Sequence, residues 1–300
     1  MTPPRHNVEG ATWLVTRRCS ERRFFLRPDG FVARAILFIL GHALAWFSIK
    51  LNAAVVLSNH WHLVITDLKG KKSQFFRLVH MMIARSVNTL RGRFEAFWAP
   101  GRPNMVRLMT PDDILDKMVY VMLNPVRANL VEHVDDWPGL VTLPEHFLDH
   151  EFSTKRPNRF FDKRGPLGSM TRFRLTRPPG FDHLSDQEFV QLLRDRIAEG
   201  EAKARQERGN KKVLGAVKVL CQHWNSKPKT RAPRFQRVPE IACRDRELRI
   251  AAIEDLLYFR TKYRAALGRF CGGARNTVFP YGTLNMRRRF RVRCRPNRSP

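Results

Sequence analysis

The chain has 300 residues, with 55 Lys and Arg against 27 Asp and Glu, which gives a formal net charge of +28 at pH 7. This excess excludes a neutral metabolic enzyme as the starting expectation and favours a polyanionic partner. Because 43% of the residues are hydrophobic and 10% aromatic, the chain can bury a core. A disordered basic tail is therefore also excluded.

The first half of the sequence alternates between strand-like and helix-like segments. Asp29 is an expected N-cap, Thr110 with Pro111 predicts a second helix start, and Pro125 is expected to end that second helix near Asn124. The pattern predicts strands over residues 11–17, 49–57 and 61–66, and helices over residues 30–47, 73–90 and 111–124. This order predicts an α+β fold with helices over an antiparallel sheet.

The second half of the sequence carries most of the charge. Residues 1–150 hold 19 Lys and Arg against 13 Asp and Glu, a net of +6, whereas residues 151–300 hold 36 against 14, a net of +22. We therefore expect a compact domain over residues 1–150, a basic linker over 151–184 and a basic, mainly helical extension over 185–300. The helices expected in the extension cover residues 185–207, 211–224 and 243–267.

Five widely spaced cysteines without a C-x-x-C pair predict reduced thiols in a cytoplasmic protein. The start of the chain shows no pattern of a secretory signal. The apolar stretch over residues 31–47 is interrupted by Arg34 and is short of a membrane span of roughly 20 residues. It predicts a buried amphipathic helix, and no membrane partner is expected.

The motif His60-Trp61-His62 is the first candidate for chemistry. On a strand, residues two apart point to the same face, so both imidazoles would point one way and Trp61 into the core. Two adjacent imidazoles are half of a divalent metal site. Taken alone, the motif is equally compatible with two half-exposed histidines at a sheet edge.

Tyr120 and Asn124 are the second candidate. Four residues apart, they share one helical face, so a phenol and an amide oxygen could meet the two histidines. Alternatively, Tyr120 is a core aromatic and Asn124 a helix cap before Pro125.

Together these segments resemble a known family. The segment VLSNHWHLVI, residues 56–65, resembles the strand motif of the HUH single-tyrosine transposases. The segment YVMLNPVRANLV, residues 120–131, and the Asp136-Trp137-Pro138 that follows resemble the REP-associated tyrosine transposase branch. Residues 12–19 and 97–98 also fit, so the resemblance covers roughly residues 8–142. Ser58 departs from the Pro of many members, and short members lack the long extension.

The resemblance implies a ferredoxin-like antiparallel sheet with helices on one face. It implies that His60, His62 and Asn124 bind a divalent metal, Mg²⁺ or Mn²⁺, and that Tyr120 is the nucleophile. In the family this tyrosine cleaves single-stranded DNA, forming a 5′-phosphotyrosine link and a free 3′-OH, and the reverse reaction rejoins strands. The implied partner is single-stranded or hairpin DNA of the REP type, bound by a monomer or homodimer.

Basic residues around the expected site are candidate DNA contacts, with solvated loop charge as the alternative for each. The candidates are Arg17, Arg18, Arg22, Arg23, Lys71, Lys72 and Arg127. The basic segments 231–249 and 287–295 are expected to contact phosphates without sequence preference, so binding should weaken with salt.

Two further hypotheses remain beside the metal-dependent DNA transesterase. One is a catalytically inactive or domesticated protein that binds hairpin DNA or RNA, and the other is a structural RNA-binding protein with incidental histidines. The presence of His60, His62, Tyr120 and Asn124 favours the active enzyme.

Overall fold

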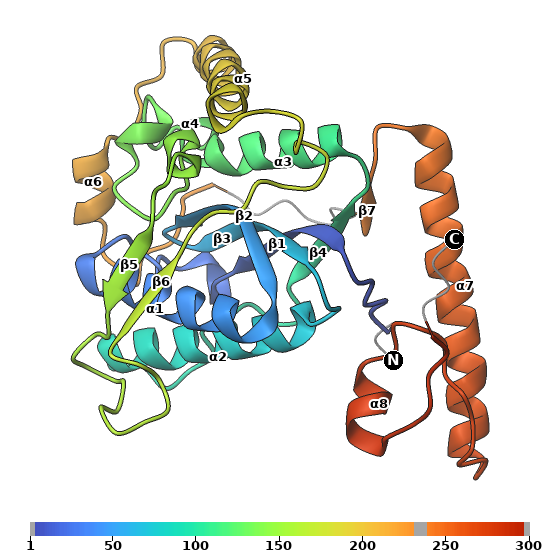
Figure 1. The fold of residues 1–300 in the computed structure, drawn as a ribbon. Helices are drawn as coiled ribbons and strands as arrows, with labels where there is room; N and C mark the ends of the chain where they lie inside the picture. Colours follow the sequence, from blue (N-terminus) through green and yellow to red (C-terminus); the bar gives the residue numbers. More distant parts are fainter. Residues whose placement is uncertain (1–3, 231–238, 297–300) are drawn as a thin grey trace.

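The computed structural model describes residues 4–230 and 239–296 and is built around a five-stranded sheet (Figure 1). The strand order is β2-β3-β1-β4-β7, antiparallel except for the parallel pair β4 and β7. With α1 between β1 and β2, and α2 between β3 and β4, the first four strands form a ferredoxin-like unit, so the predicted α+β class is confirmed. The strands are β1 (Ala11–Arg18), β2 (Ile49–Leu57), β3 (His60–Asp67), β4 (Asn104–Leu108) and β7 (Ile241–Ala242).

Helices α1 (Gly30–Phe47) and α2 (Lys72–Leu90) cover one face of the sheet. The Asp29 carboxylate accepts the backbone N–H of Val32 at 3.0 Å, which is the N-cap expected from the sequence. Trp13 and Val15 of β1 point into the core on this side, and Leu14 between them points into the core on the other side.

Helices also cover the second face of the sheet. The expectation that helices lie on one face of the sheet only is therefore corrected. Residues 53–57 of β2 are apolar at every position and fully buried, so both faces of the sheet require a packed layer. The layer on this second face contains α3 (Pro111–Met122), α4 (Asn124–Arg127) and α5 (Asp186–Arg208).

The second helix start predicted from the sequence is confirmed by a capping box in α3. Thr110 Oγ1 accepts the Asp113 N–H at 3.2 Å, and the Asp113 carboxylate accepts the Thr110 N–H at 3.0 Å. The helical path breaks at Leu123 and resumes as α4. Pro125 lies in the first turn of α4, where its missing N–H is not needed.

The expected linker over residues 151–184 carries a hairpin packed on α1. Its strands are β5 (Phe152–Lys155) and β6 (Met170–Phe173). Phe161 and Leu175 join the α1–α2 core, and a Cβ at Gly41 of α1 would lie 2.3 Å from Thr171 Oγ1. This segment is therefore part of the packed body in this structure.

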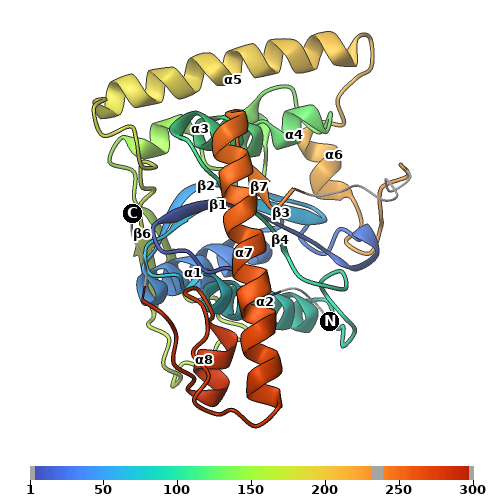
Figure 2. The same cartoon turned by 90° about the vertical axis from the view of Figure 1, so that its right-hand side faces the viewer.

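The last part of the chain is helical, as expected. Helix α7 is an arm along the β4–β7 edge of the body, with α8 near its C-terminal end (Figure 2). Its apolar side chains at Ile250, Ile253 and Leu257 face solvent, whereas Ala252 and Phe259 are buried. The helices are α6 (Ala216–Cys221), shorter than expected, α7 (Arg246–Cys271) and α8 (Asn285–Phe290); 3₁₀ turns occur at Ser20–Arg22, Val134–Asp136 and Pro144–Phe147.

Helix α1 is long and apolar enough to span a membrane by length and composition, and its buried side belongs to the core on the α1–α2 face. All five cysteines are free thiols.

Candidate active site

The two histidines of β3 lie on the sheet face covered by α3, as the strand spacing predicted. Trp61 points to the opposite face, where it is fully buried. The His60 and His62 rings are 4.9 Å apart between centroids and nearly perpendicular. The alternative of two half-exposed histidines at a sheet edge does not fit, because β3 lies between β2 and β1 and His62 is only 6% exposed.

Each imidazole is held through its Nδ1 atom. Thr16 Oγ1 lies 2.7 Å from Nδ1 of His62, its direct partner across β1 and β3. Asn59 Oδ1 lies 2.6 Å from Nδ1 of His60, and Asn59 Nδ2 donates to the carbonyl of Arg22 at 3.2 Å. Because the Asn59 oxygen can only accept, His60 carries its proton on Nδ1 and has a lone pair on Nε2.

Burial keeps both imidazoles neutral. It lowers the pKa of His60 to about 4, with the charges of Arg18 and Arg22 acting in the same direction. Burial also lowers the pKa of His62 to about 3, helped by the neighbouring His60. Neutral imidazole is the form that binds metal ions, so at pH 7 both side chains are in the ligating state.

Tyr120 of α3 extends towards these histidines. Its ring centroid lies 5.6 Å from that of His62, and the two rings are nearly perpendicular. The guanidinium carbon of Arg127 lies 5.3 Å from the Tyr120 ring centroid, and Nζ of Lys117 lies 5.9 Å from it. Positive charge is thus placed beside a ring that becomes negative when the phenol loses its proton.

Asn124 begins α4, just after the break at Leu123. It is buried, and no residue within the described ranges hydrogen-bonds its side-chain amide. An amide oxygen without a protein partner keeps its capacity to accept a hydrogen bond or to bind a cation.

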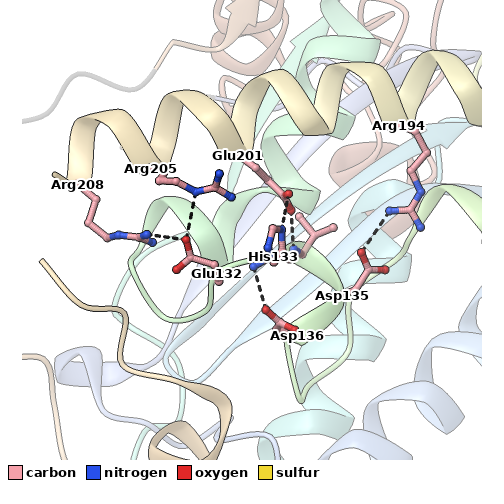
Figure 3. Close-up of polar contacts among 9 residues, drawn as sticks. Glu132, His133, Asp135, Asp136, Arg194, Glu201, Arg205 and Arg208 are labelled. Atoms are coloured by element: carbon pink, nitrogen blue, oxygen red, sulfur yellow. Dashed lines mark hydrogen bonds and ion pairs between the residues drawn. The ribbon is translucent and has the colours of Figure 1, made fainter. Parts of the chain in front are cut away.

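Helix α5 fixes the segment that follows the site helices (Figure 3). Glu201 accepts a hydrogen bond from the Val134 N–H at 2.8 Å and pairs with Nδ1 of His133 at 2.8 Å, which raises the pKa of His133. Arg208 pairs with Glu132 at 2.6 Å, and Arg194 with Asp135 at 3.2 Å. These contacts, together with the buried apolar face of α5, hold α3 and α4 against the sheet.

The residue types expected as ligands suit a divalent cation. Both imidazoles are neutral with Nδ1 already engaged, and together with the amide oxygen of Asn124 they would form a mixed nitrogen and oxygen set of the kind that Mn²⁺ or Mg²⁺ accepts. Within the described residues there is no cluster of three or more His, Cys, Asp or Glu side chains suited to a metal. A protein-bound ion would therefore rely on Asn124 and on oxygens of a substrate or water.

The predicted DNA contacts separate into two groups. Arg18 pairs across the strands with His60 and shares its face, and both Arg18 and Arg127 are exposed. Arg22 is close enough to His60 to lower its pKa, and it also hydrogen-bonds Thr230. These three arginines remain candidates for phosphate contacts.

The other predicted contacts lie elsewhere. Lys72 is only 1% exposed; its Nζ donates to His6 O and Asn7 Oδ1, each at 3.2 Å, and lies 3.8 Å above the Trp13 ring. The prediction that Lys72 contacts DNA is therefore wrong, because burial against the N-terminal segment leaves it no access. Three other candidates lie away from the site or are paired with other residues. Arg17 points to the α2 face of the sheet and donates a hydrogen bond to the carbonyl of Gly101. Arg23 forms an ion pair with Glu21, and Lys71 immediately precedes α2.

Sequence patterns did not identify Thr16, Asn59 and Lys117 as part of the site. Thr16 reaches His62 only through the β1–β3 register, which local patterns do not specify. Asn59 could have been noted because it immediately precedes His60, and Lys117 because it lies three residues before Tyr120 on the same helix.

No protein-family model and no curated protein matches the chain. Among solved structures, the chain is similar to a REP-associated tyrosine transposase bound to a REP hairpin. The two are 22% identical, and the match covers 46% of this chain and 81% of the other with a TM-score of 0.40.

Proposed function

We propose that the chain is a metal-dependent transesterase that cleaves and rejoins single-stranded DNA, with hairpin sequences as its substrates. The observation that carries this proposal is the contact of Tyr120 with His62, whose neighbour His60 is partly buried and is also kept neutral by its surroundings. A surface tyrosine without a catalytic role would not require two imidazoles held in fixed orientations beside it. Acting on DNA, such a protein would work in the cytoplasm at the nucleoid.

In the proposed reaction, Tyr120 Oη attacks the phosphorus of a phosphodiester. An Oη–P bond forms and the P–O3′ bond breaks, so the downstream part of the cleaved strand stays on the tyrosine through its 5′ phosphate, and the upstream part leaves with a 3′-OH. The phenol proton is lost to solvent, and the departing 3′ oxygen gains one. A second 3′-OH reverses the step and rejoins the strand without a nucleotide cofactor.

His60, His62 and Asn124 would hold the divalent cation. When bound, Mg²⁺ or Mn²⁺ supplies positive charge to a non-bridging phosphate oxygen and orients the scissile group. The chain's own contribution is geometric and electrostatic. Thr16 and Asn59 orient the imidazoles, and Lys117 and Arg127 surround the tyrosine ring with positive charge.

The test is a covalent adduct with labelled single-stranded hairpin DNA in the presence of Mn²⁺. We expect the unsubstituted chain to form an adduct that withstands denaturation and Tyr120→Phe to form none. Tyr258→Phe is the matched control, because Tyr258 is an exposed tyrosine on α7. An adduct that survives in Tyr120→Phe would refute the assignment of the nucleophile.

The same experiment separates the alternative function. If the unsubstituted chain binds the hairpin but forms no adduct with Mn²⁺ or Mg²⁺, the protein is a binding protein and the proposed reaction is wrong.

A further inference from the structure

A second basic region lies away from the Tyr120 site, between α2 and the α7–α8 arm. It is a cavity of about 590 Å³ whose walls come from four parts of the chain: the N-terminal segment at Pro4 and Arg5, the start of α2, the loop of residues 101–103 before β4, and the arm. Figures 1 and 2 show α7 and α8 beside the body at this end of the sheet. We call it the arm cavity.

The side chains that line the arm cavity carry charge of one sign. Among the described lining residues there is no Asp or Glu. Three of the arginines are exposed, and their guanidinium groups make no hydrogen bond or ion pair with any described residue. The lining arginines are Arg5, Arg77, Arg102, Arg264 and Arg288, and the three exposed ones without a described partner are Arg77, Arg264 and Arg288.

Polar groups without partners also line the arm cavity. Thr283 is only 4% exposed, and its Oγ1 has no hydrogen-bond partner among the described residues. The same is true of Gln74 Oε1 and His80 Nε2. These three atoms are themselves inaccessible to solvent, so the exposed arginines are the groups that a ligand in the cavity can reach.

The cationic lining is confined to the arm cavity. Pro4, Arg5, Arg102 and Pro103 also line a neighbouring cavity of about 390 Å³, but Glu240 and Asp255 line that cavity too, and Glu240 pairs with Arg260 there. Burial, and then the nearby charge of Arg102, lowers the pKa of Arg5 to about 10. Five arginines around the arm cavity match a row of phosphates better than a single small anion.

We propose that the arm cavity binds the backbone of a single strand of DNA. That the bound strand is DNA rests on the proposed function. That the ligand is a polyphosphate backbone rests on the arginines that line the cavity. The cavity lies on the α2 side of the sheet, because His80 in its wall packs against Trp61, which points away from His60 and His62. A strand bound here is held by the extension at a point separate from the reacting phosphodiester.

The test compares salt dependence of binding in two triple variants of the full chain. Binding of a fluorescent single-stranded oligonucleotide is measured by anisotropy across a salt series. The cavity variant is Arg77→Ala, Arg264→Ala and Arg288→Ala; the matched control, Arg196→Ala, Lys203→Ala and Lys212→Ala, removes the same charge from exposed positions on and after α5. Circular dichroism confirms that both variants fold.

We expect the slope of log K against log salt to become less negative by about 2 in the cavity variant. Three arginines are removed, and each single-strand phosphate contact contributes roughly 0.7 to the slope. The control should lose much less. Equal losses in the two variants would overturn the proposal, as would an equal loss of slope for duplex DNA. The adduct assay keeps the two proposals apart: an unsubstituted chain without an adduct refutes the proposed function, while the slopes still report on the arm cavity.

Discussion

Gly200 is a point of close approach between α5 and the site helices, and its substitution tests how the site is held. It lies within α5, directly above Leu123, the residue at the break between Tyr120 and Asn124. A Cβ at position 200 would lie 2.1 Å from Leu123 Cδ1 and 3.3 Å from its Cγ. We expect Gly200→Ala to displace Leu123, and with it the helix that carries Tyr120.

The size of the effect follows from these distances. Carbon atoms pack at about 3.5–4.0 Å, so Leu123 or α5 must move by roughly 1.5 Å. Leu123 is 95% buried within the α3–α5 core, so its side chain has no free space to enter. Overpacking of this kind costs about 1–3 kcal/mol, and a misplacement of about 1 Å at a reacting group costs about 10²-fold in rate.

The measurement is urea unfolding combined with the rate of adduct formation on hairpin DNA. Gly268→Ala is the matched control, because Gly268 lies within α7 and a Cβ there meets nothing within 4 Å. The control should gain up to about 1 kcal/mol in the free energy of unfolding, because alanine favours a helix more than glycine does, and should retain the adduct rate. Adding Leu123→Ala to Gly200→Ala should recover part of the stability by making room.

The reasoning would be refuted by a Gly200→Ala variant that gains stability as the Gly268→Ala control does. A variant that loses stability but keeps the full adduct rate would refute the second half, namely that α5 positions Tyr120 through Leu123.

Two further predictions concern single side chains. Thr16→Val removes the oxygen beside His62 Nδ1, and we expect the Mn²⁺ affinity, measured by calorimetry, to fall about 10- to 100-fold. The control Thr12→Val, on the same face of the strand, should leave the Mn²⁺ affinity unchanged. Burial lowers the pKa of Lys72 from 10.5 to about 7, so between pH 7 and 10.5 the unfolded chain binds a proton that the folded chain does not. In urea titrations, the free energy of unfolding should therefore rise with pH over this range relative to Lys72→Met, by up to about 5 kcal/mol. Parallel pH profiles for the two proteins would contradict the lowered pKa of Lys72.

Local signals in the sequence predicted the local structure well. The caps at Asp29 and Thr110 are confirmed because a cap depends on a few neighbouring residues. The facing direction of His60 and His62, opposite to Trp61, is also confirmed, because strand alternation depends only on spacing.

Long-range packing could not be predicted in the same way. The position of Lys72 under the N-terminal segment depends on contacts with residues 6 and 7, about 65 positions away. The exposed face of α7 looks apolar in the sequence, but small and aromatic residues such as Ala252 and Phe259 fit against the body instead. The cover that α5 provides depends on Gly200, whose lack of a side chain matters only opposite Leu123.

The position of α5 also sets the order in which the protein can assemble during synthesis. Tyr120 is made early, but the helix that holds its segment in place ends at Arg208, 88 residues later. At translation rates of about 5–20 residues per second, that interval is roughly 4–18 s. During this interval the site residues exist without the layer that orients them, so a nascent chain already carrying the tyrosine is not yet a complete enzyme.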